Sequence, residues 1–221
     1  MNAPYRPHDL LFARTPAAFQ PAGTEMDWLD DGDWMARAPL VVRREAAGRG
    51  RIPVGARGPM RRQRCAGYLA TDALARCVTP ERLAAAVVKS PALDLRMAAD
   101  KLPCIAALLA LAPRLQALGL EWGPAGGAGF WLASGLPVLR PDSDLDLLVR
   151  APQPLAAAQV DALAALQAGA ACRVDIQLDT GAGARGGGFA LNEFLRGGRV
   201  MLKTAAGPVL VADPWHRRAA A

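Results

Sequence analysis

The sequence is poor in the residues that build disulfide frameworks and zinc sites. It has four cysteines and two histidines among 221 residues. The cysteines are scattered and form no C-x-x-C pair, which excludes a zinc-ribbon pattern and the dense cysteine spacing of a small secreted domain. They are Cys65, Cys77, Cys104 and Cys172. We therefore predict reduced, mostly buried thiols in a cytoplasmic protein.

Long apolar segments are absent as well. No stretch approaches the roughly 20 apolar residues that a membrane-spanning helix needs. The first residues read MNAPYRPHDLLFAR, with proline, histidine and aspartate where a signal peptide has an apolar run. We therefore expect an intracellular protein with no membrane partner.

Lysine is scarce, because 23 of the 26 basic residues are arginine. The formal net charge is +6 and the isoelectric point about 9.7, which suggests a phosphate-bearing or acidic partner. A biased genome composition explains part of such an arginine excess equally well. Hydrophobic residues make up 52% and charged residues 21%, as is typical of a globular chain.

The most informative stretch contains DSDLDLLV at residues 142–149. If this segment is a strand, Asp144 and Asp146 project from one face while the intervening leucine enters the core on the other. Two carboxylates this close suppress each other's ionisation unless a cation lies between them, which favours a divalent-metal site. A solvated turn is the alternative for an isolated D-x-D pair.

A second alternating segment supplies a third carboxylate. In RVDIQL, at residues 173–178, the apolar side chains share one face and Asp175 lies on the other. Side by side in one sheet, the two strands would place Asp144, Asp146 and Asp175 around Mg²⁺ that also holds a substrate triphosphate. We predict that these three residues are the metal ligands and the catalytic residues.

A glycine-rich turn precedes the first of these strands. The order of glycine pair, apolar run, S-D-x-D and a later apolar-D-apolar strand resembles the signature of the polymerase-β-like nucleotidyltransferase fold. That pattern usually has Gly-Ser in the turn, where the serine helps to hold a phosphate, and here the pair is Gly126-Gly127. Backbone N–H groups of a glycine turn can still cradle a phosphate oxygen. Gly126, Gly127 and Ser143 are therefore candidate substrate-binding residues.

Arginine is concentrated near the middle of the N-terminal half. From Arg37 to Arg64 there are nine arginines and one acidic residue, which predicts a strongly positive face. Guanidinium forks match phosphate oxygens, so Arg57, Arg62 and Arg64 are candidate substrate-binding residues. An ordinary solvated basic loop is an equally good interpretation of any single one of them.

The chain is predicted to form two domains that meet near Ser90. Residues 1–89 would form a small basic N-terminal domain containing β-structure, and residues 90–221 a catalytic domain. The first 35 residues or so have an irregular pattern, whereas Leu40–Arg44 and Ile52–Gly55 predict a hairpin. Thr79 and Pro80 are typical of the start of a helix.

The elements after residue 102 are predicted in the order α, β, β, α, β, α, β, β. This order argues for the α/β (α+β) class, with a sheet covered by helices on one face. Near the end of the chain, Lys203 is a candidate contact for a departing pyrophosphate, as is Arg173 beside the third aspartate. Either cation can equally be an ordinary surface charge.

Six segments together resemble one family, the phosphoribosyl-dephospho-CoA transferase of bacterial malonate decarboxylase, also called its holo-acyl-carrier-protein synthase. They read RPHDLLF, IPVGARGPMRRQR, WGPAGG through SDLDLLVRAP, RVDIQLDT, GGFALNE and GPVLVADPW. The resemblance extends over nearly the whole chain. It implies a small N-terminal domain and a C-terminal nucleotidyltransferase domain, with the family's aspartate pair at Asp144 and Asp146.

The resemblance also implies a reaction. The family attaches the prosthetic group of 2'-(5''-triphosphoribosyl)-3'-dephospho-CoA to a serine of the apo acyl-carrier subunit of malonate decarboxylase and releases pyrophosphate. Like nucleotidyl transfer, this reaction would use Mg²⁺ at the carboxylates. Asp175 would either share a second ion or act as a general base. Nucleic acid is not an expected partner.

Two alternatives remain open from the sequence. The same core serves transfer to tRNA ends, antibiotics or protein side chains, so the motif alone does not choose the acceptor. A non-catalytic basic module that kept the fold and binds RNA or a carrier protein is the alternative from a different class. Clustering three aspartates argues against such a module, because binding alone does not need their mutual repulsion.

Overall fold

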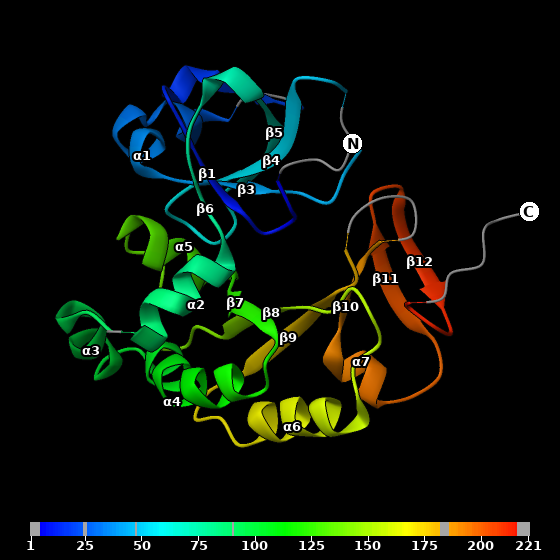
Figure 1. Ribbon diagram of the computed structural model, residues 1–221. Helices are drawn as coiled ribbons and strands as arrows, with labels where there is room; N and C mark the ends of the chain where they lie inside the picture. Colours follow the sequence, from blue (N-terminus) through cyan, green and yellow to red (C-terminus); the bar gives the residue numbers. More distant parts are fainter. Residues whose placement is uncertain (1–4, 24–25, 47, 90, 182–185, 216–221) are drawn as a thin grey trace, which may run out of the picture.

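The protein consists of two halves, each built on its own sheet. A computed structural model describes residues 5–23, 26–46, 48–89, 91–181 and 186–215, and in this part of the chain each sheet has six strands. Figure 1 shows the N-terminal half, in blue and cyan, above the C-terminal half, in green to red. The predicted α/β class, with a β-containing N-terminal part, is confirmed.

The N-terminal sheet is antiparallel, with the strand order β2-β5-β4-β3-β1-β6. Its strands are β1 (Leu10–Ala13), β2 (Phe19–Pro21), β3 (Leu40–Val42), β4 (Arg51–Arg57), β5 (Arg64–Ala70) and β6 (Leu74–Val78). Short helices connect them: η1 (Pro16–Ala18), η2 (Asp27–Asp30), α1 (Gly32–Arg37) and η3 (Thr71–Ala73). The predicted hairpin is confirmed as β3 paired with β4.

The prediction of an irregular first 35 residues was wrong. This segment contains β1 and β2, and both strands are paired with partners that lie far away in the sequence. Leu10 pairs with Val41 and with Val78, and Phe19 pairs with Leu69. Strands of three or four residues are too short to show an alternating pattern, so their formation depends on these distant partners.

Helix α2 (Pro80–Lys89) begins as predicted, and the Thr79 hydroxyl accepts a hydrogen bond from the backbone N–H of Arg82 at 3.3 Å. The helix packs against strand β7 (Glu121–Pro124) of the second sheet. The division into residues 1–89 and 90–221 stays a prediction, and Ser90 lies outside the described residues. A boundary before α2 would keep this helix with the sheet that it covers.

The C-terminal sheet carries the predicted aspartates. Its strand order is β12-β11-β10-β9-β8-β7, and β8 and β9 are its parallel pair. The remaining strands are β8 (Leu145–Arg150), β9 (Val174–Asp179), β10 (Gly188–Ala190), β11 (Val200–Thr204) and β12 (Gly207–Val211). A parallel pair needs a crossover connection, and α6 (Ala157–Ala168) provides it.

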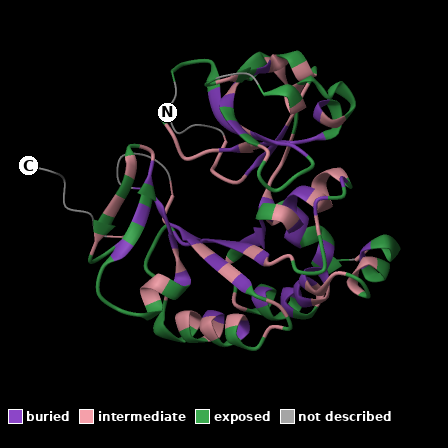
Figure 2. Ribbon diagram, turned by 180° about the vertical axis from the view of Figure 1, so that it is seen from behind, coloured by how far each residue is buried: buried purple, intermediate pink, exposed green. Residues whose placement is uncertain are grey.

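Helices cover the face of this sheet that points away from the N-terminal half (Figure 1). They are α4 (Pro103–Ala117), α6 and α7 (Leu191–Leu195), and α3 (Leu93–Ala99) packs against α4. Leu145, Leu147 and Val149 of β8 are buried with apolar residues of α4 and α6. Figure 2 shows buried positions, in purple, along the middle strands of this sheet. The other face of β8 and β9, with Asp146 and Asp175, is therefore turned toward the N-terminal half.

Two elements differ from the predicted order. The segment after the glycine pair is helix α5 (Gly126–Ser134), and the short strand β10 precedes the predicted helix near residue 190. Glycine has a low helix propensity, so the sequence of α5 does not indicate a helix. Phe130 explains its formation, because its side chain is only 1% exposed and packs with Leu136 and Val138.

The four cysteines are free, as predicted, and Cys65 and Cys104 are buried. Among the described residues, none of the helices combines the length and the apolar character needed to cross a membrane.

Candidate active site

The three predicted aspartates converge on one point. In the parallel pair of β8 and β9, Asp146 lies directly opposite Asp175, and Asp144 stands just before β8. One carboxylate oxygen from each residue lies within 4.8 Å of the others, and all three side chains are half-buried. Alternation along the two strands therefore places the carboxylates as the sequence predicts.

The electrostatics of this cluster favour a bound cation. Burial raises the pKa of Asp146 above its ordinary value of 3.8, and the charges of Asp144 and Asp175 raise it further. Arg173 donates a hydrogen bond to Asp175 at 2.7 Å, but the Arg173 side chain is 74% exposed and lies on the outer side of the cluster. A hard divalent cation prefers an all-oxygen ligand set of this kind. The three carboxylates therefore fit a metal ion.

The N-terminus of α5 lies beside the carboxylates. Gly126 has φ of 52°, and a β-carbon at this position would overlap the carboxylate of Asp146. At Gly127 a β-carbon would come within 3.1 Å of the Leu139 side chain and 3.7 Å of the Arg57 guanidinium. The first N–H groups of a helix have no partner within it, so this end of α5 suits an anion.

Two arginines reach the same place from the N-terminal sheet. Arg57 and Arg64 are paired across β4 and β5, and both line the cavities around Asp146. Arg57 is only 7% exposed, and its Nε has no hydrogen-bond partner among the described residues. Burial, followed by the charges of Arg64 and Arg61, lowers the pKa of Arg57 to about 10, so the guanidinium stays charged at neutral pH. A buried cation with an unused donor favours an anionic ligand.

The remaining predicted residues lie less centrally. Ser143 lines the outer cavity, but its hydroxyl accepts a hydrogen bond from the backbone N–H of Arg140 at 3.0 Å and so stabilises a turn. Arg62 is exposed and does not line either cavity. Lys203 is exposed on β11, and its charge contributes to lowering the pKa of His8. The substrate contacts of these residues stay predictions.

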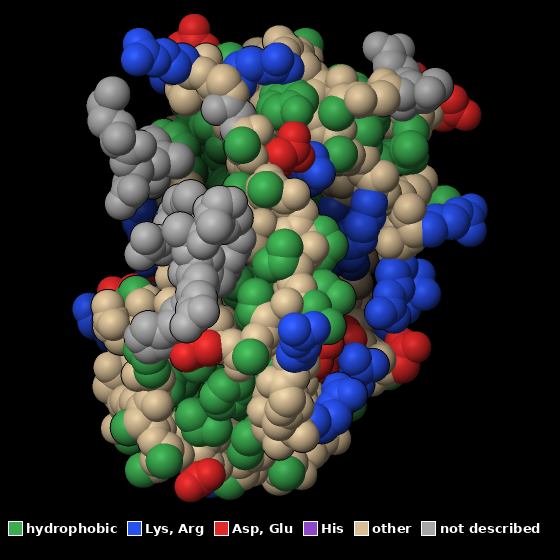
Figure 3. All heavy atoms as spheres, turned by 90° about the vertical axis from the view of Figure 1, so that its right-hand side faces the viewer, with side chains coloured by type: hydrophobic (Ala, Val, Ile, Leu, Met, Phe, Trp, Pro, Cys, Tyr) green, Lys and Arg blue, Asp and Glu red, His purple; other side chains and the backbone are tan. Residues whose placement is uncertain are grey.

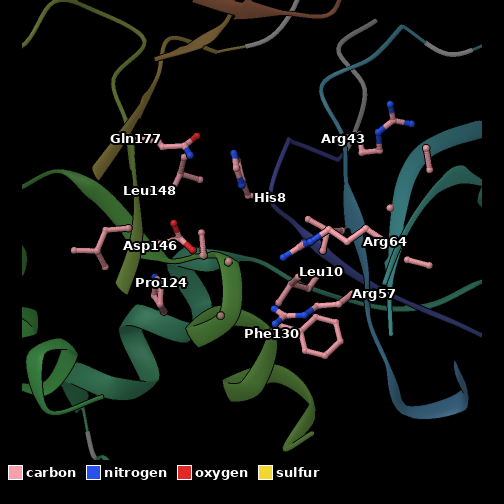
Figure 4. A pocket seen from close by; sticks show the side chains of 18 of the residues that line it. His8, Leu10, Arg43, Arg57, Arg64, Pro124, Phe130, Asp146, Leu148 and Gln177 are labelled. Carbon is pink, nitrogen blue, oxygen red and sulfur yellow. The ribbon is translucent and has the colours of Figure 1, made fainter. Parts of the chain in front are cut away.

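A cleft between the two sheets connects these groups. Its inner cavity has a volume of about 480 Å³ and its outer cavity about 210 Å³, and both are lined by Arg57, Arg64 and Asp146. In Figure 3, Lys and Arg side chains gather along one edge of the face shown, with acidic side chains among them. Figure 4 shows Asp146 facing Arg57 and Arg64 across the inner cavity.

Several lining residues were not anticipated from the sequence. His8 and Gln177 line the inner cavity, and Arg140 lines the outer one. A signal was present for Gln177, because it follows Asp175 by two residues and so shares its face of the strand. The position of His8 depends on how the two halves meet, which no local pattern reveals.

A buried ion network closes the cleft beyond the carboxylates. Arg150, at the end of β8, donates hydrogen bonds to Asp179 at the end of β9 and to Glu81 of α2, and pairs with Asp9 before β1. Arg44 of the N-terminal half also pairs with Asp179, at 2.7 Å. The network therefore ties the two halves together on one side of the cleft.

Comparison with known proteins identifies the family. The C-terminal domain of the phosphoribosyl-dephospho-CoA transferase MdcG matches residues 92–214, and the N-terminal domain of the same transferase matches residues 6–80. No solved structure matches the chain significantly.

Curated relatives agree with the family match. A phosphoribosyl-dephospho-CoA transferase of Klebsiella pneumoniae (strain 342) is 42% identical over 98% of this chain and 99% of its own length. A relative of the same name from Pseudomonas putida (strain GB-1) is 44% identical over 97% of this chain and 97% of its own length. Another, from Pseudomonas aeruginosa, is 43% identical over 95% of this chain and 93% of its own length. The chain is therefore a transferase that belongs to the phosphoribosyl-dephospho-CoA transferase family.

Proposed function

We propose that this protein attaches the phosphoribosyl-dephospho-CoA group of 2'-(5''-triphosphoribosyl)-3'-dephospho-CoA to a serine of the apo acyl-carrier subunit of malonate decarboxylase. The serine oxygen attacks the phosphorus nearest the ribose, the bond from that phosphorus to the next phosphate breaks, and pyrophosphate leaves. The observation that carries the proposal is the convergence of three carboxylates opposite a buried arginine with an unused donor.

Residues on both sides of the cleft bind the triphosphate. Arg57 and Arg64 bind phosphate oxygens from the N-terminal side, and the N-terminal N–H groups of α5 at Gly126 and Gly127 bind them from the other. Because these groups belong to the two separate halves of the protein, they hold the triphosphate from opposite sides and orient it for displacement in line. The exposed Arg62 and Lys203 would attract the donor or carrier from a distance, and their direct contacts with substrate stay predictions.

The carboxylates of Asp144, Asp146 and Asp175 would hold Mg²⁺, which supplies charge neutralisation for the leaving pyrophosphate and lowers the pKa of the attacking hydroxyl. Asp175 has a second possible role as the general base that takes the serine proton. Its ion pair with Arg173 orients its carboxylate in either role, and substitution of Arg173 by methionine would test whether that orientation matters.

A donor comparison tests the proposal. The purified protein is incubated with Mg²⁺, apo-carrier and either the triphosphoribosyl donor or ATP, and released pyrophosphate is measured. We expect pyrophosphate to appear only with the triphosphoribosyl donor and only when apo-carrier with its serine intact is present. Release from ATP instead, with tRNA or a small-molecule acceptor, would point to another nucleotidyltransferase and contradict the proposal.

A further inference from the structure

The inner cavity of the cleft extends beyond the triphosphate site. On the cleft face of β8 and β9, side chains from the two strands form successive layers. From the carboxylates inward, these layers are Asp146 with Asp175, Leu148 with Gln177, and Arg150 with Asp179. Residues two apart on a strand are separated by about 6.6 Å. The Leu148–Gln177 layer therefore lies between the metal site and the ion network, about 6.6 Å along the strands from each.

In the part of the chain that the structure describes, the arginines at the innermost layer are already paired with carboxylates. Arg150 is paired with Asp179, Glu81 and Asp9, and Arg44 is paired with Asp179. The unused guanidinium donor at Arg57 lies at the other end of the cavity, beside the carboxylates. A cation with an unused hydrogen-bond donor therefore lies at the outer end of the inner cavity. At the far end, the arginines and carboxylates are paired with each other.

His8 faces the middle layer and is held there by an unusual backbone. Its φ is 75°, in the left-handed region that residues other than glycine rarely adopt, and its N–H donates to the Val42 carbonyl at 3.0 Å. Such strain is retained where surrounding structure fixes it, often at ligand sites. Figure 4 shows His8 across from Gln177 and Leu148.

The hydrogen-bonding groups of this layer are neutral and unused. Burial, followed by the charges of Arg150 and Arg44, lowers the pKa of His8 to about 4, so the ring presents one N–H donor and one nitrogen acceptor at neutral pH. Gln177 presents an amide with both functions. Among the described residues, neither side chain makes a hydrogen bond.

The walls around these two groups are apolar. Leu10, Val41 and Leu148 line the cavity, whose volume of about 480 Å³ falls within the range of about 300–1,000 Å³ for small-molecule sites. A compartment of this cavity with apolar walls and two neutral donor-acceptor groups is suited to a flat or ring-shaped polar molecule without charge. Arg43 also lines the cavity, but its guanidinium is paired with Glu45 at 2.8 Å.

We propose that this inner compartment binds the neutral nucleoside portion of the donor, with His8 and Gln177 as the residues that recognise it. The identity of the donor rests on the proposed function. Each side chain offers a donor and an acceptor, which matches the edge of a nucleobase or the hydroxyls of a ribose. The cleft would thus hold the triphosphate at Arg57 and the neutral nucleoside at His8.

The test uses two probes. One carries the nucleoside part of the donor, and the other carries its triphosphate part. Dephospho-CoA contains the nucleoside with its 5'-diphosphate and pantetheine chain but no triphosphoribosyl group, and inorganic tripolyphosphate with Mg²⁺ contains only the triphosphate. The variants are His8→Gly, which accepts the left-handed backbone, His8→Asn, which keeps a donor and an acceptor, and Gln177→Met, which keeps the length of the side chain without its amide. Binding is measured by titration calorimetry, and thermal unfolding checks the fold.

We expect His8→Gly and Gln177→Met each to weaken dephospho-CoA binding about tenfold, with partial recovery in His8→Asn. Tripolyphosphate affinity should stay within about twofold of the wild type in these variants, whereas Asp146→Asn should lose tripolyphosphate binding and keep dephospho-CoA binding. Unchanged dephospho-CoA affinity in His8→Gly and Gln177→Met would overturn the inference. So would an equal loss of both probes, or a wild type that does not bind dephospho-CoA.

Failure of the proposed function would look different. In that case no group is transferred to the acyl carrier by the wild type, while dephospho-CoA still binds in a manner that depends on His8 and Gln177. The two probes and the transfer assay therefore separate the nucleoside site from the identity of the reaction.

Discussion

Gly126 lies so close to Asp146 that a β-carbon at position 126 would overlap the aspartate carboxylate. The glycine is the first residue of α5, and the aspartate is the second residue of β8. Their contact sets the distance between the helix N-terminus and the carboxylate cluster. A side chain at Gly126 would therefore disturb the anion site and the metal site together.

Gly126→Ala should reduce transfer at least about 100-fold, because the added methyl group displaces Asp146 from the cluster. The variant also acquires left-handed strain of about 1 kcal/mol. Gly135→Ala is a matched control, since Gly135 has φ of 70° and a β-carbon there would meet no atom within 4 Å. Initial rates of carrier modification measure the difference. Equal activity in the two variants would show that the contact with Asp146 does not matter.

Arg57→Gln should weaken donor binding about 10- to 100-fold, because it removes a charge-assisted hydrogen bond from a buried position. The loss should persist at high salt, since buried charges are poorly screened. Donor KM at low and high ionic strength measures both effects. A KM that matches the wild type under both conditions would remove Arg57 from the phosphate site.

Arg62→Gln provides the matched comparison for an exposed arginine on the same half of the protein. We expect only a small increase in donor KM at low salt, and none at high salt, because solvent screens this side chain. A loss as large as that of Arg57→Gln would mean that Arg62 reaches the donor directly.

Asp146→Asn should abolish transfer yet stabilise the metal-free protein at neutral pH. Its pKa in the folded protein is raised above the ordinary 3.8, so the folded state disfavours the ionised form. Protonated Asp146 therefore contributes to the free energy of unfolding. This contribution is complete below the ordinary pKa and is lost as the pH rises through the raised pKa of the folded protein. In the presence of a chelator, the variant should therefore have a higher unfolding temperature than the wild type at pH 7. The difference should become smaller in acid.

Asp161→Asn, on the exposed surface of α6, is the control for removing one negative charge. Its unfolding temperature should change little. If Asp146→Asn were no more stable than the wild type without metal, the repulsion among the three carboxylates would be too weak to favour a cation.

Arg150→Met should destabilise the fold by about 3–5 kcal/mol, because it leaves the buried carboxylate of Asp9 without its cation and that of Asp179 with Arg44 alone. Arg43→Met, which removes a more exposed pair with Glu45, should cost less than about 1 kcal/mol. Urea unfolding measures both. Equal stability of the two variants would contradict a structural role for the ion network.

The carboxylate cluster could be predicted because strand alternation is a local property. Asp144 and Asp146 share a face by their spacing, and Asp175 has the same pattern on its own strand, so only the adjacency of the two strands had to be assumed. The helix that Thr79 caps was also predictable, since its cap and first proline are neighbours in the sequence.

The missed features all depend on distant parts of the chain. Strands β1 and β2 form because they pair with strands far away, and α5 forms because Phe130 packs into a core supplied by other segments. The pairing of Arg150 with Asp9 and Asp179, and the position of His8 in the cleft, arise where the two halves meet. Local propensity carries no information about such contacts.

The mass of the purified acyl carrier, measured after incubation with protein, triphosphoribosyl donor and Mg²⁺, tests the central claim most directly. With the wild type, the carrier serine should gain the mass of one phosphoribosyl-dephospho-CoA group, and with a folded Asp144→Ala, Asp146→Ala double variant the mass should stay that of the apo form. A carrier fully modified by the double variant would contradict the account.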